Sequence, residues 1–450
     1  MSGYTLKNGI VVTANKTPQT GGITISGERI ASVKPSDASI GQGLSFDLKE
    51  KSYIYPSLIN THDHLQGNYR PAIGPAEGTF YLTWQPWDND LKASATFAER
   101  SKLSREELYT LSSYKCIFSG VTTVNDHFPH IINKNILPTL PIRAILEYGL
   151  AHETTSYDLK WGDGVHEEHT KAVNNKWPFI THLAEGFDDE SMHSLENLDK
   201  QGILDKHCLF IHCVGLSDED IKKIAKAGAS VSLCVSSNML MFNVTAKIKK
   251  MIKAGINLTI GTDSSASGPA NLLEEMKNIR SLYQKMYGED LSPKRIFEMV
   301  TINSAKAFWM QDRIGSLEEG KLGDIMVMKA RNNDPYENLV CASMEDIELL
   351  TLEGNPIYGE LRFLDIFSCT KKGGTQSGGT LPEGYSEIIV GKRPMFVIGD
   401  PAALYKEIRA RTGFKKVLDF LPFEPCDNSV RQSEVAQVKA AGTKLKKDLV

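Results

Sequence analysis

Histidines that follow short apolar runs are the residues of this sequence best suited to metal chemistry. All eleven histidines lie between His62 and His212. His62 and His64 stand two apart at the end of an apolar run, and side chains two apart in a strand share a face. Two imidazoles on one face suit Zn²⁺ or Fe²⁺, which bind neutral ring nitrogens. Because H-x-H pairs also arise by chance, this pair alone only suggests a metal site.

Three further apolar runs also end in an ionisable residue. His182 follows residues 179–181 with Glu185 three positions on, and His212 and Asp263 end later runs. Each of these residues taken singly is more often structural, and Asp263 alone would be read as a loop carboxylate or helix cap. Burying so many ionisable groups in one place is costly unless they are partnered. Together they therefore predict a shared metal site.

The elements that must position these residues predict a parallel sheet. Helix-like stretches at residues 104–118, 218–227 and 245–254 alternate with seven candidate strands. These strands are residues 57–61, 121–125, 142–148, 179–181, 209–211, 230–234 and 257–260. The alternation is typical of an α/β fold and predicts a (β/α)₈ TIM-like barrel with its active site at the carboxyl ends of the strands. Residues 151–176 contain no clean strand, so one barrel strand has no assigned place.

The segments on either side of this barrel predict a second, smaller unit. Short strands at 10–13, 22–25 and 29–33 and later ones at 324–328 and 347–352 favour a β-sandwich. Two helices, 271–287 and 293–308, precede the later strands, and Ser292 and Pro293 are expected to begin the second. We therefore predict three parts: a barrel at 55–311, a composite β-sandwich of 1–54 and 312–370, and a partly helical C-terminal extension at 371–450.

Composition restricts the function classes. The net charge of −4 gives no electrostatic reason to expect nucleic acid or an anionic membrane as partner. No apolar run reaches the roughly 18 residues that a membrane span needs, and no signal peptide is expected. The seven cysteines are an odd number without a C-x-x-C pair, which suits reduced thiols. We expect a cytoplasmic protein with a small-molecule substrate.

The order of the motifs resembles a known family. H-x-H, then H-L-A-E, H-C-V and G-T-D, is similar to the amidohydrolase superfamily, and within it to the mononuclear-metal aminohydrolases. That branch contains guanine, cytosine, adenosine-like and triazine deaminases and chlorohydrolases. The resemblance covers about residues 1–360 and includes 120–126, 236–238, 303–307 and 313–324.

This resemblance implies a mechanism. His62, His64, His182 and Asp263 would bind one Zn²⁺ or Fe²⁺ per subunit, and a divalent ion lowers the pKa of its bound water to about 7. Glu185 would shuttle a proton to the substrate, His212 would orient the water, and Asp263 would take its proton. The expected enzyme is a hydrolase of carbon–nitrogen bonds that releases ammonia from a planar nitrogen heterocycle, in a homo-oligomer. A chlorohydrolase or cyclic-amide hydrolase on the same scaffold, or a non-catalytic binding or scaffold protein, are the alternatives.

Four residues near these motifs are candidates for substrate contacts. Gln66 and Arg70 follow the second histidine, and Arg70 suits either a substrate carboxylate or ring carbonyl or a salt bridge. Trp84 suits either a cover over a planar substrate or an oligomer contact, and His127 either a pocket wall or plain packing.

The sequence also departs from the family pattern. Asp63 stands between the first two histidines, where relatives more often carry a small or neutral residue. We expect it to face away from the histidines and to meet an Arg, a Lys or a backbone N–H. Residues 151–176, which normally help to form the substrate pocket, do not match, so the substrate stays open.

Overall fold

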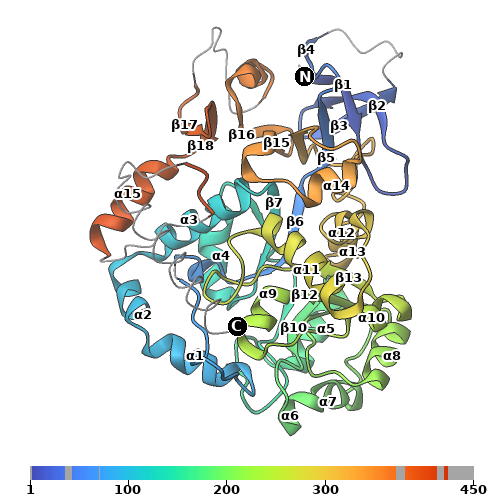
Figure 1. Ribbon diagram of the computed structural model, residues 1–450, viewed down its shortest axis with the longest axis vertical. Helices are drawn as coiled ribbons and strands as arrows, with labels where there is room; N and C mark the ends of the chain where they lie inside the picture. Colours follow the sequence, from blue (N-terminus) through green and yellow to red (C-terminus); the bar gives the residue numbers. More distant parts are fainter. Residues whose placement is uncertain (1–2, 36–42, 70, 371–380, 413–419, 424–450) are drawn as a thin grey trace, which may run out of the picture.

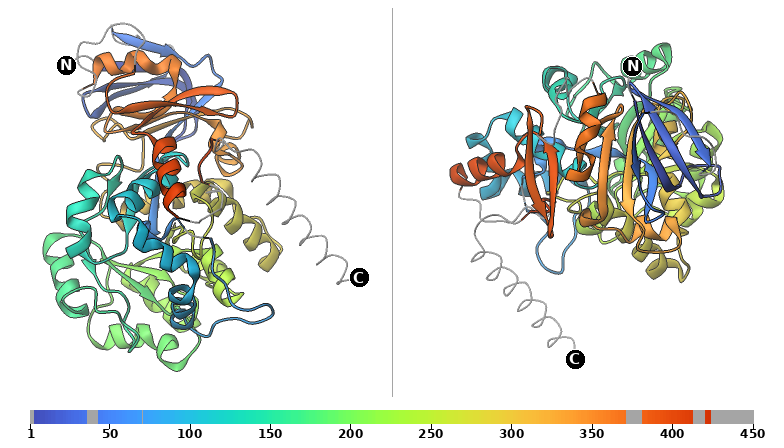
Figure 2. Two further views of the ribbon diagram at one scale, coloured as in Figure 1. Left: turned by 90° about the vertical axis from the view of Figure 1, so that its left-hand side faces the viewer. Right: turned by 90° about the horizontal axis from the view of Figure 1, so that it is seen from above.

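In the computed structural model the described residues are 3–35, 43–69, 71–370, 381–412 and 420–423. They form a mixed α/β structure in two parts, a β-rich end and a larger body of parallel strands and helices (Figure 1). The side view separates the two parts clearly (Figure 2). Within the described residues no helix is long and apolar enough to cross a membrane.

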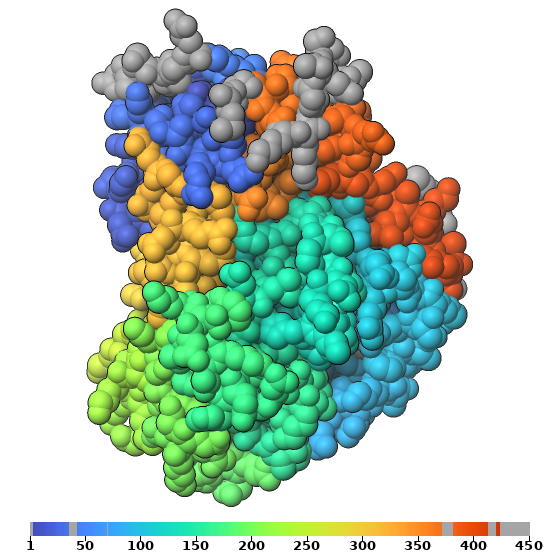
Figure 3. All heavy atoms as spheres, turned by 180° about the vertical axis from the view of Figure 1, so that it is seen from behind, coloured from blue at the N-terminus to red at the C-terminus, as the bar shows by residue number. Residues whose placement is uncertain are grey.

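The β-rich end is one ten-stranded sheet made from both ends of the described chain. Its order is β17-β18-β16-β15-β14-β5-β1-β2-β3, with β4 paired to β1. The strands are β1 (Gly3–Val11), β2 (Gln19–Ser26), β3 (Arg29–Pro35), β4 (Leu44–Asp47), β5 (Ser52–Pro56), β14 (Ile325–Lys329), β15 (Ile347–Leu352), β16 (Asn355–Glu360), β17 (Tyr385–Val390) and β18 (Arg393–Ile398). The N-terminal and later strands therefore share one sheet. In the space-filling view from behind, atoms of the N-terminal segment (blue) lie next to atoms of the later segment (orange) (Figure 3).

The body contains eight strands in two sheets whose paired strands are all parallel. One sheet has the order β6-β7-β8 and the other β13-β12-β11-β10-β9. The strands are β6 (Leu58–Asp63), β7 (Val121–Asp126), β8 (Arg143–Ala144), β9 (Gly149–Leu150), β10 (Phe179–Leu183), β11 (Cys208–His212), β12 (Ser230–Leu233) and β13 (Asn257–Ile260). Most of their residues are buried, which explains their continuous apolar runs.

Helices connect and cover these strands. They are α1 (Trp84–Ala93), α2 (Ala95–Glu99), α3 (Arg105–Ile117), α4 (His130–Ile136), α5 (Val165–Asn175), α6 (Asp189–Met192), α7 (Ser194–Lys200), α8 (Asp218–Ala227), α9 (Val235–Phe242), α10 (Ile248–Ala254), α11 (Leu272–Tyr287), α12 (Pro293–Met299), α13 (Ile302–Ala307), α14 (Pro335–Val340) and α15 (Pro401–Arg411). Short 3₁₀ helices are η1 (Leu65–Gly67), η2 (Arg100–Lys102), η3 (Leu137–Thr139), η4 (Met344–Asp346) and η5 (Leu361–Cys369). Ser104 begins α3 with a capping box, which satisfies the first amides of that helix.

The prediction of a single strand at 142–148 is wrong. That run contains the two-residue β8, and the strand without an assigned place is β9, directly after it. A Cβ on Gly149 would lie 2.2 Å from the Glu168 backbone oxygen, so α5 packs directly against the β9 backbone. A strand of two residues with a glycine presents no apolar run, which explains why the sequence pattern missed it.

The single helix predicted at 293–308 is also wrong. The predicted start is confirmed, since α12 begins at Pro293 directly after Ser292, although the Ser292 side chain makes no cap hydrogen bond. The predicted length is wrong, because the segment is divided into α12 and α13. The Ile59 amide of β6 donates a hydrogen bond of 2.9 Å to the Val300 carbonyl at the end of α12. Because the Val300 carbonyl accepts this hydrogen bond from β6, it does not continue the helix, and the chain turns before α13 begins.

Gly354, in the turn between β15 and β16, allows a test of the close contact that this turn makes with Gly27. Its φ is +72°, and an added Cβ would lie 2.4 Å from the Gly27 backbone oxygen. Left-handed backbone costs about 1–2 kcal/mol for other residues, and overpacking costs about 1–3 kcal/mol more. We expect Gly354→Ala to lower the free energy of unfolding by about 3 kcal/mol in urea titrations.

Gly228 is the matched control for this substitution. It has the same φ of +72°, but the nearest atom to its added Cβ is 3.6 Å away. We expect Gly228→Ala to cost only the backbone term of about 1 kcal/mol. Equal losses in the two variants would show that the Gly27 contact does not matter.

Candidate active site

The candidate residues meet at the carboxyl ends of the parallel strands. His62 and His64 lie at and just after the end of β6, and His182 lies in β10. One ligand atom from each of these three histidines lies within 4.8 Å of the others. The ring centroids of His62 and His64 are 4.7 Å apart, and those of His62 and His182 are 5.0 Å apart. Asp263 completes the group, with its Oδ1 3.9 Å from His64 Nε2.

The backbone at the strand ends brings these side chains together. The amides of Thr262 and Asp263 both donate hydrogen bonds of 3.0 Å to the His62 carbonyl, so β13 ends against β6. His212 and Asp263 have φ values of +67° and +59°, which are uncommon for residues with a side chain. Strained backbone of this kind persists where the surrounding structure holds it, and it is frequent at functional sites.

Three observations fit this histidine cluster to a divalent ion. Both ring nitrogens of His62 are buried and have no hydrogen-bond partner among the described residues. His182 Nδ1 lies 2.7 Å from the His152 carbonyl, which directs its other nitrogen toward the cluster, as in metal-binding histidines. Burial, followed by the neighbouring histidines, lowers the pKa of His62 and of His182 well below the ordinary value. Their rings are therefore neutral, which is the form that binds a metal.

Glu185 and His212 form a second pair beside the cluster. His212 Nε2 lies 3.4 Å from Glu185 Oε1, and its Nδ1 lies 2.8 Å from Asn238 Oδ1. Burial, with smaller contributions from Asp263 and Glu153, raises the pKa of Glu185 well above its ordinary value. The environment of Glu185 therefore favours the protonated carboxyl more than water does.

Asp263 is buried too, but its partners favour the ionised form. Its Oδ2 accepts hydrogen bonds of 2.8 Å from the hydroxyls of Ser237 and Ser267, and its Oδ1 accepts one of 2.6 Å from the Ser264 amide. Burial alone would raise the pKa of Asp263. The His64 and His212 rings and these hydrogen bonds outweigh burial and lower it.

The predicted substrate contacts divide into two groups. His127 and Trp84 lie close to the cluster: His127 is buried with its ring 4.8 Å from that of His182, and the rings of Trp84 and His152 form a T-shaped pair 4.8 Å apart. Gln66 Oε1 instead accepts a hydrogen bond of 2.7 Å from Arg100, so this side of Gln66 faces η2. Arg70 lies outside the described residues.

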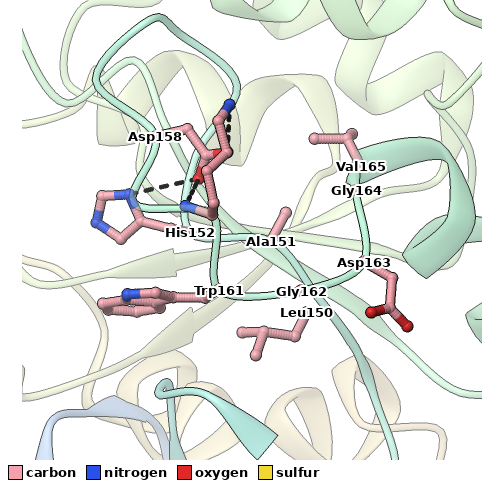
Figure 4. Close-up of a pocket in the computed structure, with 10 residues that line it drawn as sticks. Leu150, Ala151, His152, Asp158, Trp161, Gly162, Asp163, Gly164 and Val165 are labelled. Carbon is pink, nitrogen blue, oxygen red and sulfur yellow. Dashed lines mark hydrogen bonds and ion pairs between the residues drawn. The ribbon is translucent and has the colours of Figure 1, made fainter.

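The sequence pattern missed two aromatic rings beside the cluster, which belong to the segment after β9. His152 lies 5.1 Å from His182, and Trp161 lies 4.4 Å from His152 and 6.0 Å from His64, ring to ring. Both residues line a cavity of about 260 Å³ that this segment forms. In the close-up of the cavity, the rings of His152 and Trp161 extend from the chain in the same direction (Figure 4). Their segment has no periodic pattern that would have identified them, because it is mostly loop.

The expectation for Asp63 is confirmed. Lys115 Nζ of α3 lies 3.0 Å from Asp63 Oδ2, and both side chains are buried. Asp63 therefore pairs with the ammonium group of Lys115. It is not among the described residues that converge on the histidine cluster.

The chain is similar to a known protein family and to two curated relatives. A model of the amidohydrolase family matches residues 168–359. A 5-methylthioadenosine/S-adenosylhomocysteine deaminase of Thermodesulfovibrio yellowstonii is 32% identical over 377 residues, which cover 70% of this chain and 82% of the relative. Another, of Pyrococcus abyssi, is 26% identical over 407 residues, covering 76% of this chain and 91% of that protein.

A solved structure shows the same fold. Atrazine chlorohydrolase from Arthrobacter aurescens TC1, complexed with zinc, superposes with a TM-score of 0.64 at 20% identity, covering 79% of this chain and 95% of that chain. The chain belongs to the amidohydrolase family. It is accordingly a metal-dependent hydrolase of carbon–nitrogen bonds other than peptide bonds, and the predicted family and enzyme class are confirmed.

Glu153 is a buried carboxyl beside this site whose charge can be tested. Its Oε1 accepts hydrogen bonds from Trp84 Nε1 (3.1 Å) and the Thr155 hydroxyl (2.8 Å). Burial raises its pKa from 4.5 to about 7 despite these hydrogen bonds. The raised pKa means that the fold favours protonated Glu153, a contribution that is complete below pH 4.5 and is lost as pH rises to about 7.

Glu153→Gln keeps the acceptor for Trp84 and removes the charge. We expect the wild type to lose up to about 3 kcal/mol of unfolding free energy relative to this variant between pH 4.5 and 7, since one pKa unit is worth about 1.4 kcal/mol. Urea titrations of the metal-free proteins across this range measure the difference. Parallel stability profiles of the two proteins would contradict the assignment.

Proposed function

We propose that His62, His64, His182 and Asp263 bind one divalent ion, Zn²⁺ or Fe²⁺, in each subunit of a homo-oligomer. The proposal is supported by the unpartnered nitrogens of His62 and by the convergence of the three imidazoles. A divalent ion there would supply an activated water, because a bound cation lowers the pKa of its water. We further propose that the eight parallel strands form a (β/α)₈-type barrel, supported by the hydrogen bonds from the end of β13 to the His62 carbonyl.

The chemistry proposed for this site is the hydrolytic deamination of a nitrogen heterocycle. Glu185, which favours its protonated form, donates a proton to a ring nitrogen of the substrate and makes the adjacent carbon more electrophilic. Asp263 favours its carboxylate form and accepts a proton from the attacking water. His212, held by Asn238, faces Glu185 and orients the water. The water oxygen bonds to the ring carbon, the proton that Asp263 accepted passes to the amine, and the carbon–nitrogen bond breaks so that ammonia leaves.

The substrate class that this site fits best is a planar aminopurine or its nucleoside. The rings of Trp161, His152 and Trp84 lie beside the cluster and suit a flat aromatic ligand. The relatives named above, which are deaminases of methylthioadenosine and S-adenosylhomocysteine, support the same class. Ammonia release from a panel of adenosine-type nucleosides, guanine, cytosine, pterins and triazines tests it. No ammonia from any of them would reject deamination.

Glu185 is the proposed acid of the two buried carboxyls, the other being Asp263. Its substitution therefore tells most about the type of reaction. Removing a general acid typically costs 10²- to 10⁴-fold, so we expect Glu185→Gln to reduce kcat for ammonia release by about 10²-fold or more. Metal content by mass spectrometry serves as the control and should stay at the wild-type level. A chlorinated triazine offered to both proteins separates the alternative, because chloride leaves without protonation. Unchanged kcat for chloride release in Glu185→Gln would favour a chlorohydrolase.

Removal of the metal should affect stability as well as activity. An ion that binds only the folded protein stabilises it by an amount that grows with its concentration over its dissociation constant. We expect chelation to abolish ammonia release and to lower Tm, and added Zn²⁺ or Fe²⁺ to restore both. His62→Ala should have a low Tm that does not respond to added metal. A Tm of wild type that is insensitive to chelator would count against the site.

A further inference from the structure

A buried ammonium group lies directly behind the candidate metal site. Lys115 of α3 is 1% exposed, and its Nζ lies 3.0 Å from Asp63 Oδ2, 2.9 Å from Asn68 Oδ1 and 2.8 Å from the Asp263 backbone oxygen. A lysine ammonium has three N–H donors and accepts none. Each of the three donors therefore has its own acceptor.

Asp63 is equally well partnered and joins two separate segments. Its Oδ1 accepts a hydrogen bond of 3.0 Å from Asn68 Nδ2. Its Oδ2 accepts hydrogen bonds from Asn60 Nδ2 at 3.2 Å and from the Thr262 hydroxyl at 3.0 Å, in addition to the lysine. These partners lie in two segments of the chain. The first is β6 with the turn after it, which carries His62 and His64, and the second is the loop after β13, which carries Asp263.

The contacts act on the backbone that presents the proposed ligands. Asp63 stands between His62 and His64, so its side-chain hydrogen bonds restrain the strand end that carries both imidazoles. Asp263 is held at a φ of +59°, and Lys115 donates to the carbonyl of this same residue. One ammonium group thus restrains both segments at once.

Stabilisation of the fold does not by itself explain why Lys115 and Asp63 are buried as a pair. Taking two charges out of water costs several kcal/mol per ion, and apolar residues of similar volume are often as stabilising as a buried ion pair. Groups that orient metal-binding residues, in contrast, commonly govern metal affinity without touching the ion. The position of this pair, directly behind three proposed ligands, agrees with such a role.

We propose that Lys115 and Asp63 are positioning residues that fix His62, His64 and Asp263 for a divalent ion and so set the affinity of the protein for it. This inference rests on the metal site proposed above. The pair contacts neither ion nor substrate and acts only through the side chains and backbone that it holds.

A double-mutant cycle of the full-length protein tests this proposal. The variants are Asp63→Asn, Lys115→Met and the combination of both, each measured for its Zn²⁺ dissociation constant by competition with a chromophoric chelator. Loss of groups that orient metal ligands typically costs 10- to 100-fold, so we expect each single variant to bind Zn²⁺ about 10- to 100-fold more weakly. The visible spectrum of the Co²⁺-substituted proteins should change as well, since it reports the ligand geometry.

The double variant separates positioning from mere stability. It leaves no unpaired buried charge, so its Tm should recover relative to the single variants. Its Zn²⁺ affinity and Co²⁺ spectrum should stay impaired, because the hydrogen bond to the Asp263 carbonyl is still missing. Recovery of affinity together with Tm, or single variants with wild-type affinity and spectrum, would overturn the positioning role. Wild-type protein that binds neither Zn²⁺ nor Co²⁺ would instead overturn the proposed metal site, and this inference with it.

Two controls keep the test decisive if a charge variant does not fold. Thr262→Val removes two neutral hydrogen bonds, the one that the hydroxyl donates to Asp63 and the one of 2.8 Å that it accepts from Asn60 Nδ2. It should weaken Zn²⁺ binding less than loss of the lysine, whereas Thr262→Ser should bind like wild type. Wild-type affinity and spectrum in Thr262→Val would count against the network.

The ion pair of Arg143 and Asp324, which joins β8 to the segment before β14, is the matched control for loss of an ion pair away from the site. Asp324→Asn should lower Tm and leave Zn²⁺ affinity unchanged; a loss of affinity there would show that any buried-pair loss has this effect.

Discussion

The rest of the site depends on how buried imidazole and carboxyl groups find partners at the carboxyl ends of the parallel strands. Such groups are costly to bury alone. His182 finds a backbone carbonyl, Asp263 finds two serine hydroxyls and an amide, and Asp63 finds Lys115. The ring nitrogens of His62 find nothing among the described residues. A divalent cation is the partner that we propose for these nitrogens.

The same burial gives two carboxyls opposite properties. Burial, with the nearby carboxyls of Asp263 and Glu153, raises the pKa of Glu185. The hydroxyls, amide and imidazoles around Asp263 instead outweigh burial and lower its pKa. Pairs of carboxyls whose environments separate their pKa values mark the acid and the base of an active site. This contrast supports the roles that we propose, in which Glu185 gives a proton and Asp263 accepts one.

The strand ends are held in conformations that few residues adopt freely. Ala184, His212 and Asp263 all have positive φ values, between +51° and +67°. Each such residue costs about 1–3 kcal/mol, which the packing and hydrogen bonds around it must offset. Contacts such as the one from Lys115 to the Asp263 carbonyl show how α3, outside the strands, contributes to this offset. The site is therefore a property of the strands together with their surrounding helices.

Most strand ends and candidate ligands were predictable from the sequence, because an apolar run followed by His182, His212 or Asp263 is a local pattern that survives in the fold. The β9 strand, His152 and Trp161 were not predictable, since a two-residue strand and a loop carry no periodicity. Nor did the sequence name Lys115 as the partner of Asp63, because a buried pairing between distant elements leaves no trace in local spacing. The sequence by itself determined which side chains could take part in the chemistry. Only the tertiary structure decided which of them are buried together, and burial is what sets their protonation and their need for partners.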